Sequence, residues 1–142
     1  MEQAKFANFV QVFVTADIEK TVRFYHDLLG FRVVPHYEQT EKFAALYRDK
    51  VEILLVQAKF GTVRANRDAF GAGFDAYIVP ETTDQVRAFY EEIKARGVTI
   101  LQDWQITPYG SSEFAFQDCD GRIIGIGRIK EKEVFFANGK GK

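Results

Sequence analysis

The chain has 142 residues, of which 46% are hydrophobic and 14 are phenylalanine, enough for one compact domain or two half-domains that share a core. Its net charge of -1 gives no general attraction to nucleic acid or to an anionic membrane surface. The single cysteine, Cys119, excludes an internal disulfide and favours a reducing compartment, so we expect a cytoplasmic protein. The longest aliphatic run, residues 53–56, is far too short to span a membrane, and no signal peptide is expected.

The first half of the chain is predicted to form a strand, a helix and three more strands. Residues 9–14 are rich in β-forming side chains and predict the first strand. Asp17 is a good helix N-cap, and apolar residues then recur at helical spacing until Gly30, which is typical of a helix end. Three further strands are predicted at about 31–38, 43–48 and 51–57.

The same order of elements is predicted a second time, after a glycine-rich segment that we expect to be a linker loop, residues 59–73. A strand at 74–79 precedes a capping box formed by Thr82 and Gln85, and Gly97 ends the following helix. Three strands complete this second unit, near 98–105, 112–117 and 122–129.

The predicted fold class is therefore α+β, with two tandem β-α-β-β-β units. The first unit covers residues 8–58 and the second covers 74–129, within a single domain, 1–142. Each helix buries its apolar stripe on one face of its sheet, so the other face stays free to line a U-shaped cleft. The tail, residues 130–142, has one apolar patch, Val134-Phe135-Phe136, which can dock on the body of the protein or on a partner chain.

Two motifs stand out in this pattern, one in the first unit and one near the end of the second. The first is FYHDLLGFRVV, residues 24–34, and the second is EFAFQDCDGRIIGI, residues 113–126. With the tandem units, they make residues 8–129 resemble the vicinal oxygen chelate superfamily, which includes glyoxalase I, extradiol dioxygenases, fosfomycin-resistance enzymes and bleomycin-resistance proteins. The turn before the last strand usually has the sequence Asp-Pro-Asp-Gly in this superfamily, and Cys119 replaces the proline here. The resemblance implies the paired-sheet fold and a homodimer.

Metal-dependent members of the superfamily place one ligand, usually His, Glu or Gln, on each of four inner strands. The resemblance places these positions at Val10, Leu54, Phe74 and Gly125, and none of these side chains donates a lone pair to a cation. A shift of two residues keeps the same strand face and brings Glu52 to the second position, but leaves the others apolar. We therefore expect no metal and no cofactor, as in the bleomycin-resistance branch.

Glu113 is the one candidate for catalytic chemistry. If Phe114 and Phe116 point into the sheet–helix core, Glu113 and Ala115 point to the cleft. Glu52 is also expected to face inward. Two carboxylates over an apolar cleft would bind a cationic group, or one would act as a general base. The alternative is that each carboxylate lies at a strand end, solvated or ion-paired.

Aromatic residues supply the flat surfaces that a pocket for a planar molecule needs. Trp104 and Tyr109 flank a loop and are expected at the cleft edge, whereas Phe43 and Tyr77 are expected to fill the core. Neither histidine is expected to act as a ligand or a catalyst, because no second histidine accompanies either of them in a chelating pattern.

The sequence thus predicts a protein that binds a small organic molecule in its cleft without a metal. The alternatives left open are a metal-independent lyase or isomerase with Glu113 as base and Tyr109 as acid, a metal-dependent lyase or dioxygenase, and a sensor or assembly module. No residue is assigned as catalytic. The predicted ligand-binding residues are Val10, Val12, Glu52, Leu54, Phe74, Ala76, Trp104, Tyr109, Glu113, Ala115 and Gly125.

Overall fold

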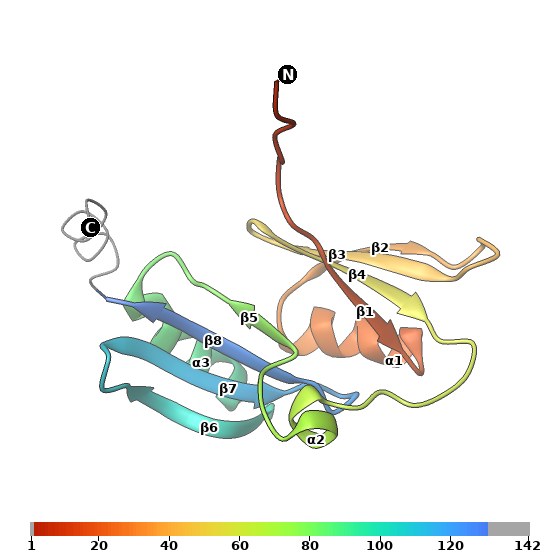
Figure 1. Cartoon of the computed structure of the whole chain (residues 1–142). Coiled ribbons are helices and arrows are strands. Elements are labelled where there is room, and N and C mark those ends of the chain that lie inside the picture. Colours follow the sequence, from red (N-terminus) through yellow and green to blue (C-terminus); the bar gives the residue numbers. More distant parts are fainter. Residues whose placement is uncertain (1, 131–142) are drawn as a thin grey trace. The chain divides into compact units, whose positions relative to one another are not determined.

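The structure is a computed structural model that describes residues 2–130 (Figure 1). The chain divides into two compact units, with the boundary between Thr62 and Val63. The apolar patch of the tail, Val134-Phe135-Phe136, lies outside the described residues. Within the described range, no helix is both long and apolar enough to cross a membrane.

The first unit has the predicted β-α-β-β-β order, and its four strands form one sheet in the order β1-β4-β3-β2. Strand β1 is parallel to β4, and the other neighbours are antiparallel. The helix lies on one face of this sheet (Figure 1). The elements are β1 (Gln11–Thr15), α1 (Ile18–Arg23), a π-helical segment η1 (Phe24–Leu28), β2 (Arg32–His36), β3 (Phe43–Arg48) and β4 (Val51–Gln57).

The helix of the first unit begins where the sequence predicts. Asp17 is the N-cap of α1, and its Oδ1 accepts a hydrogen bond from the Lys20 N–H at 3.2 Å. The π-helical turn η1 was not predicted, because the apolar spacing does not distinguish it from α-helix. The helix stops at Gly30, whose φ of 74° favours glycine, and Arg48 Nη1 donates to the carbonyl of Leu29 at 2.7 Å.

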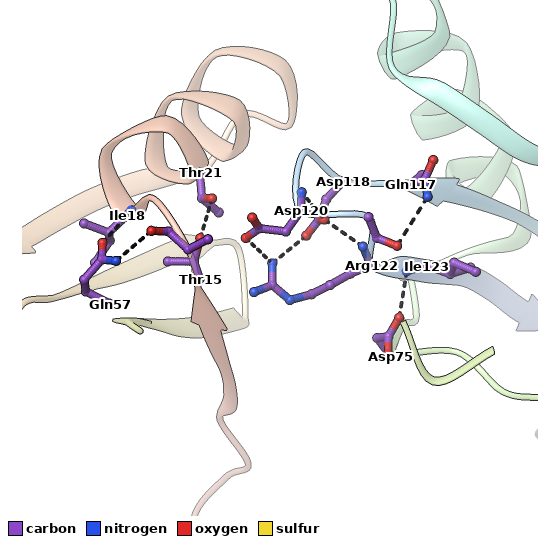
Figure 2. A network of polar contacts seen from close by, with 12 residues as sticks. Thr15, Ile18, Thr21, Gln57, Asp75, Gln117, Asp118, Asp120, Arg122 and Ile123 are labelled. Atoms are coloured by element: carbon purple, nitrogen blue, oxygen red, sulfur yellow. Dashed lines mark hydrogen bonds and ion pairs between the residues drawn. The ribbon is translucent and has the colours of Figure 1, made fainter. Parts of the chain in front are cut away.

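Polar contacts fix the turn between β1 and α1 (Figure 2). The hydroxyls of Thr15 and Thr21, both fully buried, lie 2.7 Å apart. Gln57, at the end of β4, accepts from the N–H of Ile18 at 2.9 Å and donates to the carbonyl of Ala16 at 2.7 Å. The helix start is therefore tied to the strand beside β1, and its orientation over the sheet does not depend on the helix alone.

The second unit repeats the order and forms a sheet in the order β5-β8-β7-β6. Helix α3 lies on one face of this sheet (Figure 1). Thr82 caps α3 by accepting from the Gln85 N–H at 3.2 Å, as the capping box predicted. The elements are α2 (Asn66–Phe70), β5 (Ala76–Ile78), α3 (Thr83–Ala95), β6 (Thr99–Ile106), β7 (Ser111–Gln117) and β8 (Ile123–Ile129).

The expectation that residues 59–73 form only a loop is wrong, because the short helix α2 lies within them. This helix has no side-chain cap of its own. Instead, Asp75 accepts from the N–H of Asn66 through Oδ1 and from the N–H of Ile123 through Oδ2, each at 2.8 Å. The carboxylate that supports the helix start lies nine residues beyond Asn66, so the usual local pattern of a helix start is absent.

The hairpin between β7 and β8 is held by a buried ion pair (Figure 2). Arg122 Nη1 lies 2.9 Å from Asp118 Oδ2 and 3.1 Å from Asp120 Oδ2. The Asp118 side chain is fully buried and also accepts from the backbone N–H groups of Asp120 and Arg122. A buried carboxylate and guanidinium need each other, because either one alone would be an uncompensated charge.

We expect the Asp118→Asn substitution to lower the free energy of unfolding by about 3 kcal/mol, because it leaves the buried Arg122 guanidinium without its closest anion. The matched Asp120→Asn substitution should cost less, because this carboxylate is partly exposed. Urea unfolding of both variants measures the difference. Equal losses would contradict the importance of the Asp118 pair.

Candidate functional site

The face of the first sheet that turns away from its helix is apolar and exposed. Phe13 packs against Tyr25 of the helix, so its neighbours Val12 and Val14 point the other way, and each is about half exposed. Val12 is paired with Leu54 in the register of β1 and β4. The first unit therefore presents a flat apolar surface to anything that binds on this side.

The predicted binding residues of the first unit gather on this surface. Glu52 and Leu54 are both partly buried and lie two residues apart on one face of β4. This face belongs to the same surface as Val12, because Leu54 is the register partner of Val12. Glu52 lies opposite Tyr47 of β3. Val10 comes directly before the first residue of β1 and is partly exposed. One carboxylate thus lies beside the apolar surface.

In the second unit, Tyr77 lies across strand β8 where that strand has two glycines. A Cβ atom at Gly125 would lie 2.6 Å from Tyr77 Cδ2 and 3.1 Å from Phe74 Cδ2. A Cβ atom at Gly127 would overlap the Tyr77 hydroxyl. Real Cβ atoms do not approach other atoms so closely, so the position of the Tyr77 ring requires glycine at both places.

The Tyr77 hydroxyl donates a hydrogen bond to Glu113 Oε2 at 2.7 Å. Glu113 is only 8% exposed, whereas Tyr77 is 42% exposed. Burial raises the pKa of Tyr77, and the hydrogen bond to Glu113 raises this pKa further. Tyr77 therefore keeps its proton at physiological pH and remains a hydrogen-bond donor to the carboxylate.

This arrangement corrects two predictions. Tyr77 was expected in the core, but it lies on the face of the sheet opposite α3. Ala76 was expected to contact the ligand, but it pairs with Ile124, which pairs in turn with Phe116 on the α3 side. The strand alternates from residue to residue, so the face that holds Tyr77 cannot also hold Ala76.

Two further predicted residues share the face of Tyr77 but are covered. Ala115 is fully buried in a cluster with Ala65 and Ile123, and Phe74 packs against this cluster. Gly125 is likewise buried and lies within contact distance of the Phe74 and Tyr77 rings, whose centroids are 5.6 Å apart. The surface available on this face is therefore formed by the two rings, with Glu113 beside them.

Trp104 and Tyr109 belong to a different place in the second unit. Trp104 Nε1 donates to Ser112 Oγ at 2.8 Å, and the Arg87 guanidinium of α3 lies 4.7 Å from the centroid of the indole ring. Trp104 was expected at the cleft edge, but these contacts place it on the side of the sheet that carries α3, and β6 has bulges that change its register against β7. Tyr109, 65% exposed, lines the same hollow of about 510 Å³ as Trp104.

The four positions that the resemblance assigns to metal ligands do not fit a metal ion. Val10, Leu54 and Phe74 have hydrocarbon side chains, and Gly125 has none. The space beside Gly125 is filled by the ring of Tyr77. Within residues 2–130, no group of three or more His, Cys, Asp and Glu side chains could hold a metal ion.

Comparisons with known proteins agree with this architecture. The chain matches the family model of the Glyoxalase/Bleomycin resistance protein/Dioxygenase superfamily over residues 7–126. No curated protein matches the chain.

Among solved structures, it resembles a glyoxylase/bleomycin resistance protein/dioxygenase domain from Frankia sp. EAN1pec, with a TM-score of 0.70, 19% identity and coverage of 91% of this chain and 95% of the other. It also resembles UcmS2, with a TM-score of 0.67, 20% identity and coverage of 89% and 98%. A third similar structure is TioX from Micromonospora sp. ML1, with a TM-score of 0.65, 19% identity and coverage of 87% and 99%.

We expect the Gly127→Ala substitution to lower the free energy of unfolding by about 1–3 kcal/mol, because its methyl group would overlap the Tyr77 hydroxyl. In a Tyr77→Phe background, which lacks that oxygen, the same substitution should cost less. Urea unfolding of the four proteins of this double-mutant cycle measures the coupling. The same loss in both backgrounds would contradict the contact.

The raised pKa of Tyr77 predicts a distinct ionisation in alkali. Between pH 10 and the raised pKa, the Tyr77 phenol keeps its proton in the folded protein, whereas the same phenol has lost its proton in the unfolded chain. The stability that this gives is complete below about pH 10, the ordinary tyrosine pKa, and is lost as the pH rises through the raised pKa. Absorbance titration should show that Tyr77→Phe removes a phenol that ionises above pH 10. Loss of a phenol that ionises near pH 10 would contradict the burial and hydrogen bond of Tyr77.

Proposed function

The chain belongs to the Glyoxalase/Bleomycin resistance protein/Dioxygenase superfamily, and we propose that it binds a small organic molecule without using a metal ion. The observation that carries the proposal is the Tyr77 ring on Gly125 and Gly127, with its hydroxyl on Glu113. A relative that binds a metal has a ligand side chain at the position of Gly125. Here the ring of Tyr77 takes up that space and its hydroxyl is bound to the Glu113 carboxylate, which suits recognition of an organic molecule.

Affinity in this proposal comes from apolar and aromatic surface. Tyr77 gives the second unit an exposed aromatic ring, and the partly buried ring of Phe74 lies beside it with the centroids 5.6 Å apart. Val12 and Val14 give the first unit an exposed aliphatic surface. Apolar area removed from water contributes about 25 cal/mol per Å², so contact with either surface would favour a ligand with a hydrocarbon or aromatic body.

Selectivity in this proposal comes from Glu113. Tyr77 donates to one carboxylate oxygen, Oε2, and thereby fixes the orientation of the group. A carboxylate has a second oxygen with further acceptor capacity, and a hydrogen bond to a charged group is stronger than one between neutral groups. The ligand class that fits is therefore a molecule with an apolar or aromatic body and an ammonium, amine or similar donor group.

We further propose that the protein is a cytoplasmic homodimer. The single cysteine, Cys119, excludes an internal disulfide and suits a reducing compartment. Strands β1, β2, β5 and β6 are the edge strands of their four-stranded sheets, and unpaired edges are places at which a second chain can add.

A second candidate function is metal-independent acid–base catalysis, such as that of a lyase or an isomerase. The observation that favours it is the buried Glu113 carboxylate with a phenol hydrogen-bonded to it. In this version Glu113 is the base. The partner at hydrogen-bond distance from Glu113 is Tyr77, and Tyr109, which the sequence suggested as the acid, lies on the exposed loop between β6 and β7.

The test is a thermal-shift screen against a panel of aromatic and aliphatic amines, each matched with a neutral compound of the same carbon skeleton. A ligand at 100 times its Kd stabilises the folded protein by about 2.7 kcal/mol, which a melting curve detects. We expect amines to be preferred, and Glu113→Gln to weaken their binding by about 10-fold or more. The exposed control Glu91→Gln should bind normally.

The outcomes separate the candidate functions. Weaker amine binding by Glu113→Gln, with no conversion of any ligand by the wild-type chain, supports the binding protein. Conversion that Glu113→Gln abolishes while it still binds the compound would instead establish acid–base catalysis. A panel in which no compound raises the melting temperature would overturn the proposed ligand class.

A further inference from the structure

We propose that the hollow of about 510 Å³ next to Trp104 is a second binding site, which takes a small molecule with an aromatic ring, a carboxylate and an ammonium group. Free aromatic amino acids belong to this class. The hollow lies where the N-terminal part of α3 meets the β6–β7 hairpin and the end of β8. The proposal goes beyond the function proposed above and does not depend on it.

The hollow has the size of a small-molecule site and belongs to one unit. Pockets for organic ligands measure about 300–1,000 Å³, so this volume is sufficient for an amino acid. All of the lining residues lie between Thr83 and Lys130, and the second unit begins at Val63. The lining is therefore complete without any residue of the first unit.

Trp104 gives the hollow an aromatic wall that is held in place. Its Nε1 donates to Ser112 Oγ at 2.8 Å, and the Ser112 hydroxyl donates in turn to the carbonyl of Thr83 at 3.3 Å. Ser112 is fully buried, so these bonds join the indole to both β7 and α3. Because the indole N–H already has an acceptor, the rest of the ring offers hydrocarbon contact. A wall that is fixed before binding loses little conformational entropy when a ligand arrives.

Other apolar side chains of the lining are incompletely covered. Ile106 and Tyr109 are both more than half exposed, and Ile129 is 41% exposed. A ligand with an aromatic body would remove part of this area from water, which favours binding. The apolar part of the lining therefore suits an aromatic ring.

The hollow carries charges of both signs. Arg87 and Lys130 are cationic, Asp84 is anionic, and all three are exposed. The Arg87 guanidinium lies 4.7 Å from the centroid of the indole, and its Nε lies 3.6 Å from Glu91 Oε1. The backbone N–H of Lys130 donates to the carbonyl of Gly110 at 3.1 Å, which fixes the start of the lysine side chain at the hollow.

These charges determine the ligand class. A carboxylate alone would be attracted by Arg87 and Lys130 but repelled by Asp84, and an ammonium group alone would meet the reverse. A molecule with both groups can pair each of them with its opposite, since guanidinium and ammonium have several N–H donors and a carboxylate has two acceptor oxygens. With the indole beside the ligand ring, this combination describes an aromatic amino acid.

The test uses the fluorescence of Trp104, the only tryptophan of the chain, which reports a ligand in the hollow. The full-length protein is titrated with three probes that share a phenyl ring. Phenylalanine carries both charges, hydrocinnamate only the carboxylate, and phenethylamine only the ammonium group. We expect saturable binding of phenylalanine, about 2–5-fold tighter than that of either singly charged probe, which is the usual contribution of an exposed ion pair.

Two variants test the charges separately. Asp84→Asn should weaken the binding of phenylalanine and phenethylamine but not that of hydrocinnamate, because only the first two probes have an ammonium group. Arg87→Gln should weaken the binding of phenylalanine and hydrocinnamate but not that of phenethylamine. The control is Asp68→Asn, which changes an exposed aspartate of α2 outside the hollow and should bind all three probes as the wild type does.

The absence of a saturable change in Trp104 emission with phenylalanine would overturn the proposal. Equal losses for all three probes in both variants would also overturn it, because the charges would then have no selective role. A response that Glu113→Gln removes and Asp84→Asn leaves intact would place the ligand at the Tyr77–Glu113 pair and contradict binding in the hollow. None of these outcomes depends on the amine screen, so this proposal and the proposed function are tested separately.

Discussion

The second unit depends on the close approach of Tyr77 to β8. Only glycine at 125 and 127 leaves room for the phenol ring to lie on the strand, and only that position brings the hydroxyl within 2.7 Å of Glu113. The ring then shields the strand, and the carboxylate gains a neutral donor in place of a charged partner. One steric condition on β8 thus determines both the shape of this face and its chemistry, because a side chain at Gly125 would displace the ring.

Two carboxylates, Asp75 and Asp118, hold this part of the fold in place. Asp75 joins the start of α2 to the start of β8, and Asp118 pairs with Arg122 inside the β7–β8 hairpin (Figure 2). Both contacts lie at the N-terminal end of β8, just before Gly125. The strand is therefore fixed in register where it enters the sheet, and its glycines are held opposite Tyr77.

The fold could be predicted from the sequence because its signals are local. Alternation, the caps at Asp17 and Thr82, and the glycines that end the helices predicted the correct order of the strands and of the two helices, α1 and α3, that lie on the sheets. Helix α2 escaped prediction because its supporting carboxylate, Asp75, lies outside the segment. The partners within the candidate site were harder still, since the approach of Tyr77 to Glu113 joins residues 36 positions apart. Apolar composition favoured a core position for Tyr77, and no sequence pattern shows that two glycines make room for it.

The central claim is that a phenol ring and a carboxylate, in place of a metal ion, form the recognition surface of this chain. The most direct test is the metal content of untagged protein, measured by elemental mass spectrometry before and after incubation with nickel, zinc, manganese and iron. The account predicts no stoichiometric metal under any of these conditions, because the residues at the ligand positions lack donor atoms. One tightly held metal ion per chain would contradict it and would place the chain with the metal-dependent members of its superfamily.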